Sequence, residues 1–437
     1  MESDEKLGRY FVATKDISEG EIIFQETPLI VGPLSITFPV CVGCGNYVTS
    51  KTSTPCSKCG WPLCCKACEN SPYHVPECYF TVQRGEKVSV TSFDVHHPIY
   101  RCIPSLRCLY QKKFAPDVWK KIIKLESHCD FRKDTDDYQQ DIIYVAKFIL
   151  NFFKVESLFT EEEILKLCGI MVVNSHEIPL STPSQNGLFY FLSLFEHNCK
   201  SNAYKTFTAN GRVKLIAGVP IKKGEHISIS YTEPLQTTLY RQKHLAETKF
   251  FSCLCSRCLD PSEFGTNLTA LKCQKGTCAG VMLPKNFQED NSPWLCSTCD
   301  NKVSLKYAID VTMRVGDELI VMDKGNVDDC KKFLQYYAKL LSPNHAYLIE
   351  IKLALAQLIG NGSQTRQSLT VDDLIYKIQL CDEVIEVVKK VSPAEKRVIG
   401  IMLIEIYAAK TELQRRRPNQ TTTFKSNENP LETLMVV

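Results

Sequence analysis

The sequence predicts an α+β fold in which cysteine-rich and helical segments interrupt a β-rich core. Residues 8–33 and 186–232 contain short runs of β-branched and aromatic residues between glycine-containing turns, which is typical of strands. Residues 85–180 and the chain beyond 304 repeat apolar side chains at helical spacing. Most of the 22 cysteines are clustered, which favours metal-stabilised modules between these parts.

Composition narrows the class of protein. A length of 437 residues predicts two to four domains. The net charge of +3 does not by itself indicate a nucleic-acid binder. The start of the chain is charged and no run of 18 apolar residues occurs, so we expect no secretory signal, no membrane span and a cytoplasmic and/or nuclear location. Disulfides are rare in such compartments, which leaves metal binding to explain the cysteines.

The individual elements follow from local patterns. Strands are expected over 10–13 and 21–24, and again over 213–217 and 226–231. In the helical stretch, apolar spacing predicts helices that include 119–125 and 142–153. Thr160, which precedes three glutamates, is expected to cap another helix.

The chain beyond 304 is expected to be all helical. Ser342-Pro343 predicts a helix start, and Gly360 predicts the end of that helix. Further helices are expected over 370–390 and 394–416. The arginines at 415–417 favour a solvated helix C-terminus over contact with an acidic partner.

Eight cysteines and one histidine lie within the 38 residues 41–78, and seven of these cysteines together with the histidine form a set of eight ligands. Their short spacings let paired donors converge on Zn²⁺ at about 2.0–2.3 Å, and eight ligands fill two tetrahedral sites. Few aliphatic residues are available in this segment, so we expect metal to replace a core. Cys65 could take the place of its neighbour as a ligand. The expected ligands are Cys41, Cys44, Cys56, Cys59, Cys64, Cys68, His74 and Cys78.

Two more cysteine groups follow in the second half of the chain. Cys253, Cys255 and Cys258 supply three donors and need a distant fourth. A second group, in which seventeen residues separate two cysteine pairs, predicts a zinc ribbon. The ribbon ligands are Cys273, Cys278, Cys296 and Cys299. Most of seven further cysteines are expected to be small buried hydrophobic residues. The seven are Cys65, Cys102, Cys108, Cys129, Cys168, Cys330 and Cys381.

Several sequence blocks occur in order around these cysteines. They are Gly8-Arg9 with Gly20-Glu21, then Asn174 to Ile178, then Glu196 to Asn202, then Gly224 to Tyr231, and then Phe251 with the three cysteines that follow it. Together with the double-zinc segment, these blocks resemble the SET-and-MYND-domain (SMYD) protein lysine methyltransferases over about residues 7–415. The additional ribbon at 273–299 resembles the arthropod-type branch of that family.

The resemblance implies a β-rich SET domain that is split by a zinc-binding MYND module and a helical insert. A post-SET zinc site, the ribbon and an all-α TPR-like C-terminal domain complete the expected architecture. It also implies that Cys199 is the missing fourth donor beside Cys253, which brings the total to about four zinc ions. The expected segments are 7–40 (first part of SET), 41–78 (MYND), 79–184 (linker and insert), 185–233 (SET core), 234–264 (post-SET), 265–303 (ribbon), 304–417 (TPR-like) and 418–437 (disordered tail).

The implied activity is methyl transfer from S-adenosylmethionine to a lysine of a protein, histone or otherwise. Because the cofactor carries the reactive sulfonium, such a protein mainly orients the acceptor amine and excludes water. Tyr231 is implied as the catalytic residue. The MYND module is expected to take proline-containing peptides, and the protein is expected to be a monomer that binds neither DNA nor membranes. The implied cofactor contacts are Arg9, Asn174, Glu196, His197 and Phe251.

Three positions depart from the family pattern. Arg9 places a bulky side chain where a glycine is expected to approach the cofactor. Glu196 replaces an asparagine and can accept but not donate hydrogen bonds. Lys249 stands where active members carry a channel tyrosine. An inward ammonium would repel the sulfonium, whereas an outward one would leave Phe250 to fill the gap, and both alternatives are open.

These departures motivate a second hypothesis, a catalytically impaired SET scaffold that serves as a zinc-dependent interaction or transcription-regulating module. A sequence-specific DNA-binding zinc protein is disfavoured, because the spacing from Cys41 to Cys78 lacks the ββα finger form and no basic recognition helix follows it.

Overall fold

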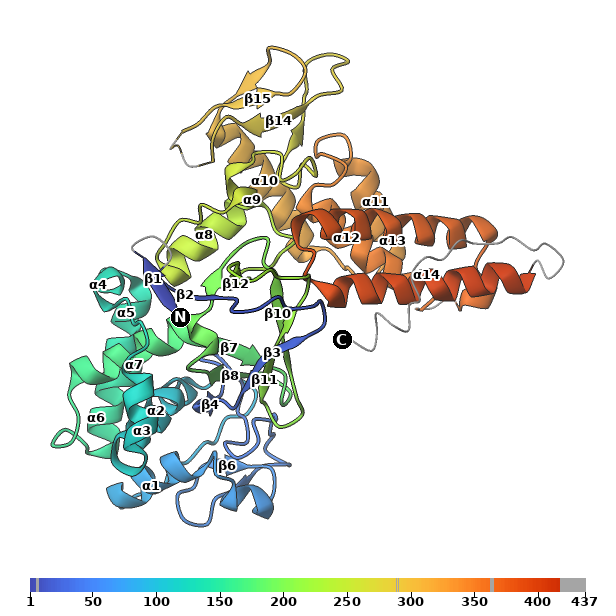
Figure 1. The fold of residues 1–437 in the computed structure, drawn as a ribbon. Helices are drawn as coiled ribbons and strands as arrows, with labels where there is room; N and C mark the ends of the chain where they lie inside the picture. Colours follow the sequence, from blue (N-terminus) through green and yellow to red (C-terminus); the bar gives the residue numbers. More distant parts are fainter. Residues whose placement is uncertain (5–7, 288, 290, 362–364, 417–437) are drawn as a thin grey trace.

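The computed structural model describes residues 1–4, 8–287, 289, 291–361 and 365–416 (Figure 1). The predicted tail at 418–437 and Arg417 lie outside the described residues. The strands of the first half are β1 (Glu2–Asp4), β2 (Gly8–Val12), β3 (Ile22–Glu26), β4 (Ile30–Gly32), β5 (Thr54–Pro55), β6 (Pro62–Leu63), β7 (Ser175–Ile178), β8 (Gln185–Leu188), β9 (Glu196–His197), β10 (Ala203–Phe207), β11 (Val213–Ala217) and β12 (His226–Ile229). The later strands are β13 (Leu271–Lys272), β14 (Val281–Pro284), β15 (Trp294–Cys296) and β16 (Lys302–Val303).

The α-helices are α1 (Val75–Arg84), α2 (Ile103–Phe114), α3 (Pro116–Ile122), α4 (Cys129–Arg132), α5 (Asp136–Asp141), α6 (Phe148–Phe153), α7 (Glu161–Asn174), α8 (Thr238–Lys249), α9 (Ser256–Leu259), α10 (Leu305–Val321), α11 (Val327–Tyr337), α12 (Ala346–Leu358), α13 (Val371–Val391) and α14 (Lys396–Arg416). Short 3₁₀ helices are η1 (Lys66–Asn70), η2 (Pro98–Cys102), η4 (Leu192–Leu194) and η5 (Arg366–Ser368), and η3 (Ile142–Lys147) is a π-helix. None of these helices is long and apolar enough to span a membrane.

Three small sheets form the β-rich core near the centre of Figure 1. Their strand orders are β1-β2-β12-β9, β10-β11-β3 and β4-β8-β7, so each sheet joins strands from before and after the cysteine-rich and helical segments. β9 and β12 run parallel, with Glu196 opposite Ser228 and His197 opposite Ile229. This register brings the Glu196-His197 pair beside the end of the strand that leads to Tyr231.

The cysteine-rich module 41–78 and the helical insert share one apolar core. Trp61 is fully buried, and its indole N–H donates to the Thr81 hydroxyl at 3.0 Å. Arg107 on α2 is also buried and donates to Glu77 at 2.6 Å, to the Val31 carbonyl at 2.6 Å and to the Val42 carbonyl at 2.8 Å. The expectation that metal replaces a core in this module is therefore wrong in part, because its apolar residues pack on the insert.

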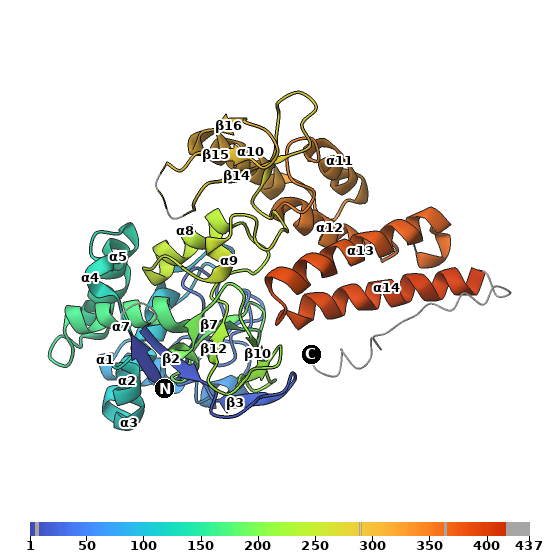
Figure 2. The ribbon, with the colours of Figure 1, turned by 45° about the horizontal axis from the view of Figure 1, so that its top comes forward.

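The ribbon strands and the C-terminal helices form a second body with its own core (Figure 2). Trp294 of β15 is fully buried among residues of α10 and of the later helices. The backbone N–H of Lys272 donates to the Leu340 carbonyl at 2.8 Å, so the ribbon is also hydrogen-bonded to this helical part.

The predicted helix start at Ser342-Pro343 is wrong. The α12 helix begins at Ala346, and the N-cap is His345, whose Nδ1 accepts from the Tyr347 N–H at 3.3 Å. The Ser342 N–H instead donates to the Ala270 carbonyl at 3.0 Å. This long-range backbone pairing holds Ser342 outside the helix, which local capping preference cannot indicate. The predicted cap at Thr160 is confirmed, since its hydroxyl accepts from the Glu163 N–H.

The β-rich core and the C-terminal helices meet at a close backbone contact. A β-carbon added to Gly218 would lie 2.5 Å from the Cα of Ala394. Nearby, the Lys396 ammonium lies 2.7 Å from the Glu19 carboxylate. The absence of a side chain at Gly218 therefore sets how closely the two parts approach.

We predict that Gly218→Val lowers the free energy of unfolding by about 1–3 kcal/mol, because the new side chain must displace the backbone at Ala394. Urea unfolding followed by circular dichroism measures the change. Gly325→Val is the matched control, because Gly325 is exposed and the nearest atom to its added β-carbon is a side-chain oxygen of Asp323. Equal stability losses in the two variants would contradict the packing argument.

Candidate active site and metal centres

Four groups of cysteine and histidine side chains converge in the described part of the chain. Within each group the donor atoms all lie within 4.8 Å of one another. Four sulfurs bound to one Zn²⁺ at 2.3 Å would be spaced by about 3.8 Å in a tetrahedron. The groups are Cys41, Cys44, Cys64 and Cys68; Cys56, Cys59, His74 and Cys78; Cys199, Cys253, Cys255 and Cys258; and Cys273, Cys278, Cys296 and Cys299.

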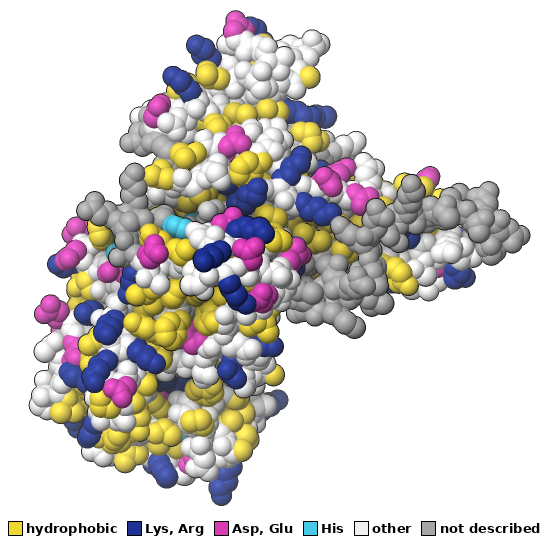
Figure 3. Space-filling model, viewed as in Figure 1, with side chains coloured by type: hydrophobic (Ala, Val, Ile, Leu, Met, Phe, Trp, Pro, Cys, Tyr) yellow, Lys and Arg dark blue, Asp and Glu magenta, His cyan; other side chains and the backbone are white. Residues whose placement is uncertain are grey.

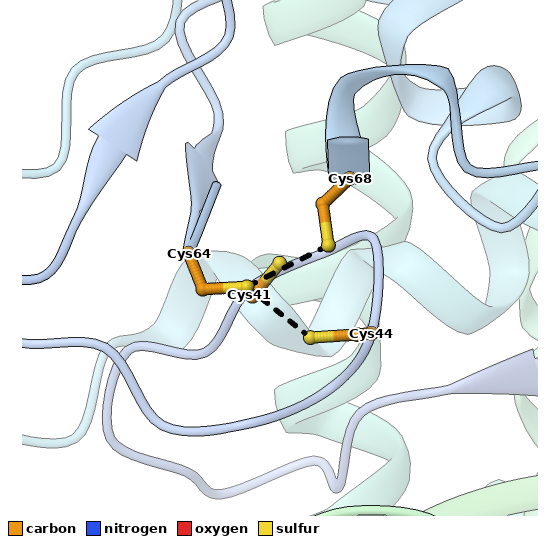
Figure 4. A group of neighbouring side chains, drawn as sticks. All are labelled: Cys41, Cys44, Cys64 and Cys68. Carbon is orange, nitrogen blue, oxygen red and sulfur yellow. Dashed lines mark hydrogen bonds between the residues drawn. The ribbon is translucent and has the colours of Figure 1, made fainter. Parts of the chain in front are cut away.

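The first group shows how the module builds such a site (Figure 4). The Cys64 Sγ lies 3.6 Å from both the Cys44 and Cys68 Sγ atoms. Cys65 is outside the group, although its Sγ lies 3.7 Å from the Cys68 Sγ, and its side chain is exposed. Of the two neighbours that the sequence left open, the geometry therefore favours Cys64 as the ligand.

The second group contains the one imidazole of the four sets. His74 Nε2 lies 3.4 Å from the Cys59 Sγ, and Glu77 Oε1 lies 3.6 Å from His74 Nδ1. A carboxylate beside the other ring nitrogen orients a metal-binding histidine. Glu77 in turn pairs with Arg107, so the helical insert supports this group.

In the ribbon group, the Cys273–Cys299 and Cys278–Cys296 sulfur pairs are each separated by 3.7 Å. The sulfur spacings in the groups match a tetrahedral zinc site closely, so the residues present fit the metal. Of the cysteines outside these groups, five are buried, Cys129 is half-buried and Cys65 is exposed.

Buried arginines surround the group that contains Cys199. Arg241 on α8 donates through Nε to the Cys199 Sγ at 3.3 Å and through Nη2 to the Cys258 Sγ at 3.8 Å. Glu263 accepts from Arg241 at 2.9 Å and from Arg257 at 2.8 Å. All three charged side chains are fully buried. Sequence reasoning missed this network, since no local signal distinguishes these arginines from exposed ones.

The Cys199 group is directly connected to the expected catalytic tyrosine. His197 Nδ1 accepts from the Tyr231 N–H at 2.9 Å, which places the ring proton on Nε2, 3.2 Å from the Cys199 Sγ. The Tyr231 hydroxyl donates to the Phe195 carbonyl. Burial, with a contribution from Glu196, raises the pKa of Tyr231. The phenol is thus a fixed, protonated group at neutral pH, and His197 acts as its support.

The expected cofactor contacts are only partly available. Both amide hydrogens of Asn174 are donated to backbone carbonyls, those of Glu126 at 2.7 Å and Ile170 at 2.8 Å. Arg9 on β2 donates to the Lys124 carbonyl at 3.0 Å. Phe251 packs beside the Cys199 group, with its ring centroid 6.0 Å from that of His197.

Glu196 has a partner that sequence reasoning missed. Its buried carboxylate lies 2.7 Å from His226 Nδ1, and the His226 ring stacks on Tyr10 with centroids 4.4 Å apart. His226 stands within the glycine-containing block at 224–231, but only the pairing of β9 with β12 brings it to Glu196.

Lys249, the last residue of α8, points inward. Its ammonium lies 5.7 Å from the centroid of the Tyr231 ring and donates to the Val173 carbonyl at 2.6 Å. Phe250 turns away and packs against the His128 and Phe131 rings. The alternative in which Lys249 points outward and Phe250 fills the gap is therefore wrong.

These side chains fit one part of an adenosyl amino acid and oppose another. Glu196 and the Asn174 oxygen are acceptors for an ammonium, Arg9 carries the charge for a carboxylate, and Phe251 offers a flat apolar face for a base. Lys249 adds a positive charge beside Tyr231, where a sulfonium would be repelled. These side chains thus suit the nucleoside and amino-acid ends of such a ligand better than its cationic centre.

A core of small sheets in which a partly buried tyrosine packs beside a zinc-type cysteine group is typical of SET-domain proteins. The SET domain family matches residues 8–232. The chain belongs to this family, and its relatives place it among the SET-and-MYND-domain (SMYD) proteins.

Three relatives illustrate the range of similarity. SET domain-containing protein SmydA-8, isoform A, of Drosophila melanogaster is 28% identical over 309 residues, which cover 69% of this chain and 64% of the relative. Histone-lysine N-methyltransferase ASHR1 of Arabidopsis thaliana is 24% identical over 423 residues, covering 90% and 83%. A SET and MYND domain-containing protein of Dictyostelium discoideum is 32% identical over 137 residues, covering 28% and 40%. The chain thus spans less than two thirds of the length of the Drosophila relative.

We predict that Cys64→Ser reduces the zinc content of the purified protein from four ions to three, because serine is a poor substitute for a thiolate ligand. Cys65→Ser is the matched control and should retain four ions, since Cys65 lies outside the group. Elemental analysis by mass spectrometry measures the content. Loss of zinc from Cys65→Ser but not from Cys64→Ser would reverse the assignment.

Proposed function

We propose that this protein transfers a methyl group from S-adenosylmethionine to a lysine of a protein substrate. The observation that carries the proposal is Tyr231, which the Phe195 carbonyl and His197 hold in a fixed position in the SET core. The relatives that are named histone-lysine N-methyltransferases support the same reaction type. Histone and non-histone proteins are both within the proposed substrate class.

The bound cofactor would supply an electrophilic methyl group on a sulfonium. In this proposal Glu196 and Asn174 accept hydrogen bonds from its amino group, Arg9 balances its carboxylate, and Phe251 covers its base. Tyr231 has the catalytic role and orients the acceptor amine through its hydroxyl. Each zinc-type group already supplies four donors, so a zinc ion bound there would have no open coordination position. The proposed role of the zinc ions is therefore structural.

The proposed partners and location rest on the same family assignment. We infer that the MYND module binds proline-containing peptides, that the protein is a monomer in the cytoplasm and/or nucleus, and that it binds no DNA directly. On the face shown in Figure 3, acidic and basic side chains are interspersed, which does not favour a polyanionic partner there. The ribbon and the Drosophila relative support assignment to the arthropod-type branch.

We predict that Tyr231→Phe lowers methyl transfer about 100-fold, because the hydroxyl that positions the amine is lost. The assay incubates the full chain with labelled S-adenosylmethionine and a mixed protein lysate. Tyr240→Phe, on the exposed side of α8, is the matched control and should keep the wild-type rate. Complete absence of transfer by wild-type protein that is folded and loaded with zinc would contradict the proposed function.

A second candidate function is a SET scaffold that binds proteins without catalysis. The inward ammonium of Lys249 and the engagement of Glu196 with His226 favour it. We predict that the double variant Lys249→Tyr, Glu196→Asn binds S-adenosylmethionine at least tenfold more tightly than the wild type, because it removes the repelling charge and restores an amide. Calorimetry measures the affinities. A double variant that binds S-adenosylmethionine no more tightly than the wild type would show that other residues limit binding.

A further inference from the structure

The Lys249 side chain is held in place by its surroundings on several sides. Its backbone ends α8, and the next residue, Phe250, has a positive φ of 61° that directs the two side chains apart. The ammonium donates to the Val173 carbonyl at the end of α7 and lies over the Tyr231 ring. An amine therefore stands beside the tyrosine at which the substrate amine is expected.

The groups around this amine are mostly basic. Lys205 on β10 lies with its Nζ 3.0 Å from His176 Nδ1 on β7. Burial, and then repulsion by Lys205, lowers the pKa of Lys249 to about 8. Burial, Lys205 and Lys249 together hold the pKa of His176 well below its usual range. His176 is therefore neutral at pH 7, and the charge of this region comes from the two lysines.

The other titratable groups near Lys249 offer little compensation. Burial is the main cause of a lowered pKa for both His128 and His244, and Lys249 adds to it in each case. Glu177 and Glu233 act on Lys205, whose own pKa is lowered by burial. Across the Tyr231 ring, Glu196 and Arg9 contribute opposite charges.

We propose that Lys249 makes this pocket selective for the charge on the ligand's sulfur, so that it holds neutral S-adenosylhomocysteine in preference to cationic S-adenosylmethionine. The inference rests on the proposed function, because it assumes that the pocket takes an adenosyl amino acid. Lys249 is then a specificity-determining residue that favours the product form over the substrate form.

The two ligands make this a direct comparison, since they differ only in one methyl group and one positive charge on sulfur. Contributions from the base, the ribose and the amino-acid end cancel in the ratio of the two affinities. Two unit charges about 5–6 Å apart at an effective dielectric near 20 change an affinity by about 100-fold. Because Lys249 has a pKa of about 8, it can lose its proton when the sulfonium binds, and this limits the preference for S-adenosylhomocysteine at pH 7 to about tenfold.

The preference should depend on pH with a defined sign. Below pH 8 the Lys249 amine is a cation and repels the sulfonium, and above pH 8 it becomes neutral. The ratio of the two affinities should therefore approach one as the pH rises from 7 to 9.5. Burial also lowers the pKa of the neighbouring Lys205, so the pH series needs a variant that removes Lys249 alone.

The experiment measures both affinities by calorimetry on the full chain at pH 7 and pH 9.5. Lys249→Met keeps the length of the side chain and removes its charge, and we expect the preference to fall to less than about threefold at both pH values. Lys243→Met is the matched control on the same helix. Lys243 is 73% exposed and ion-paired with Glu247 at 3.8 Å, so its removal should leave the preference unchanged.

An equal ratio in wild type and Lys249→Met at pH 7 would overturn the proposal. So would a folded Lys249→Met protein that binds neither ligand, because removal of the charge must leave the site for the neutral ligand intact. If Lys249→Met does not fold, the wild-type pH series decides, and a ratio that is constant from pH 7 to 9.5 overturns the proposal.

The lysate assay separates the inference from the proposed function. Methyl transfer without a charge preference would leave the function standing and overturn the inference. A preference that Lys249→Met abolishes, in a protein that transfers no methyl group, would support the inference and contradict the function.

Discussion

The balance of charge around the Cys199 group is the constraint on which the rest of the site depends. Four thiolates and one Zn²⁺ would leave two negative charges in a buried place, and such charges need close partners. Arg241 contacts two of the sulfurs, while Glu263 joins Arg241 to Arg257. Arg257 then reaches the carbonyls of Cys199, Pro234 and Val391. The same network therefore supports the active site on one side and contacts the end of α13 on the other.

This arrangement explains why a structural metal group bears on catalysis. Cys199 contacts His197, and His197 receives the Tyr231 N–H, so the position of the tyrosine depends on the cysteine loop. A short distance away stands the amine of Lys249, whose pKa is lowered by burial and by the positive charge of Lys205. Burial disfavours the charged form of this amine, and the lowered pKa limits the cost because the neutral form is easier to reach. The pocket thus combines a conventional tyrosine support with an unusual charge.

Local sequence patterns predicted the parts that depend on nearby residues. Cysteine spacings of two to four residues defined the groups because two donors so close in sequence can reach one ion. Thr160 was recognisable as a helix cap because the N–H that donates to its hydroxyl belongs to Glu163, only three residues further on. Cys199 came only from the resemblance, since it lies 54 positions before Cys253 in the sequence. The helix start predicted at Ser342 was wrong because the Ser342 N–H pairs with the distant carbonyl of Ala270. The apolar core around Trp61 was missed because the residues that pack against it lie on the helical insert.

The sequence by itself determined the mixed class of fold and most of the zinc-type donors, whereas Cys199 and Tyr231 were singled out by the resemblance to a family. The tertiary structure alone decided where the charges lie: Lys249 points toward Tyr231, Glu196 turns to His226, and two arginines become fully buried beside the sulfurs. The physical reason is that ligand spacing and capping are local properties of the chain. The direction of a charged side chain depends instead on desolvation and on partners that only folding brings together.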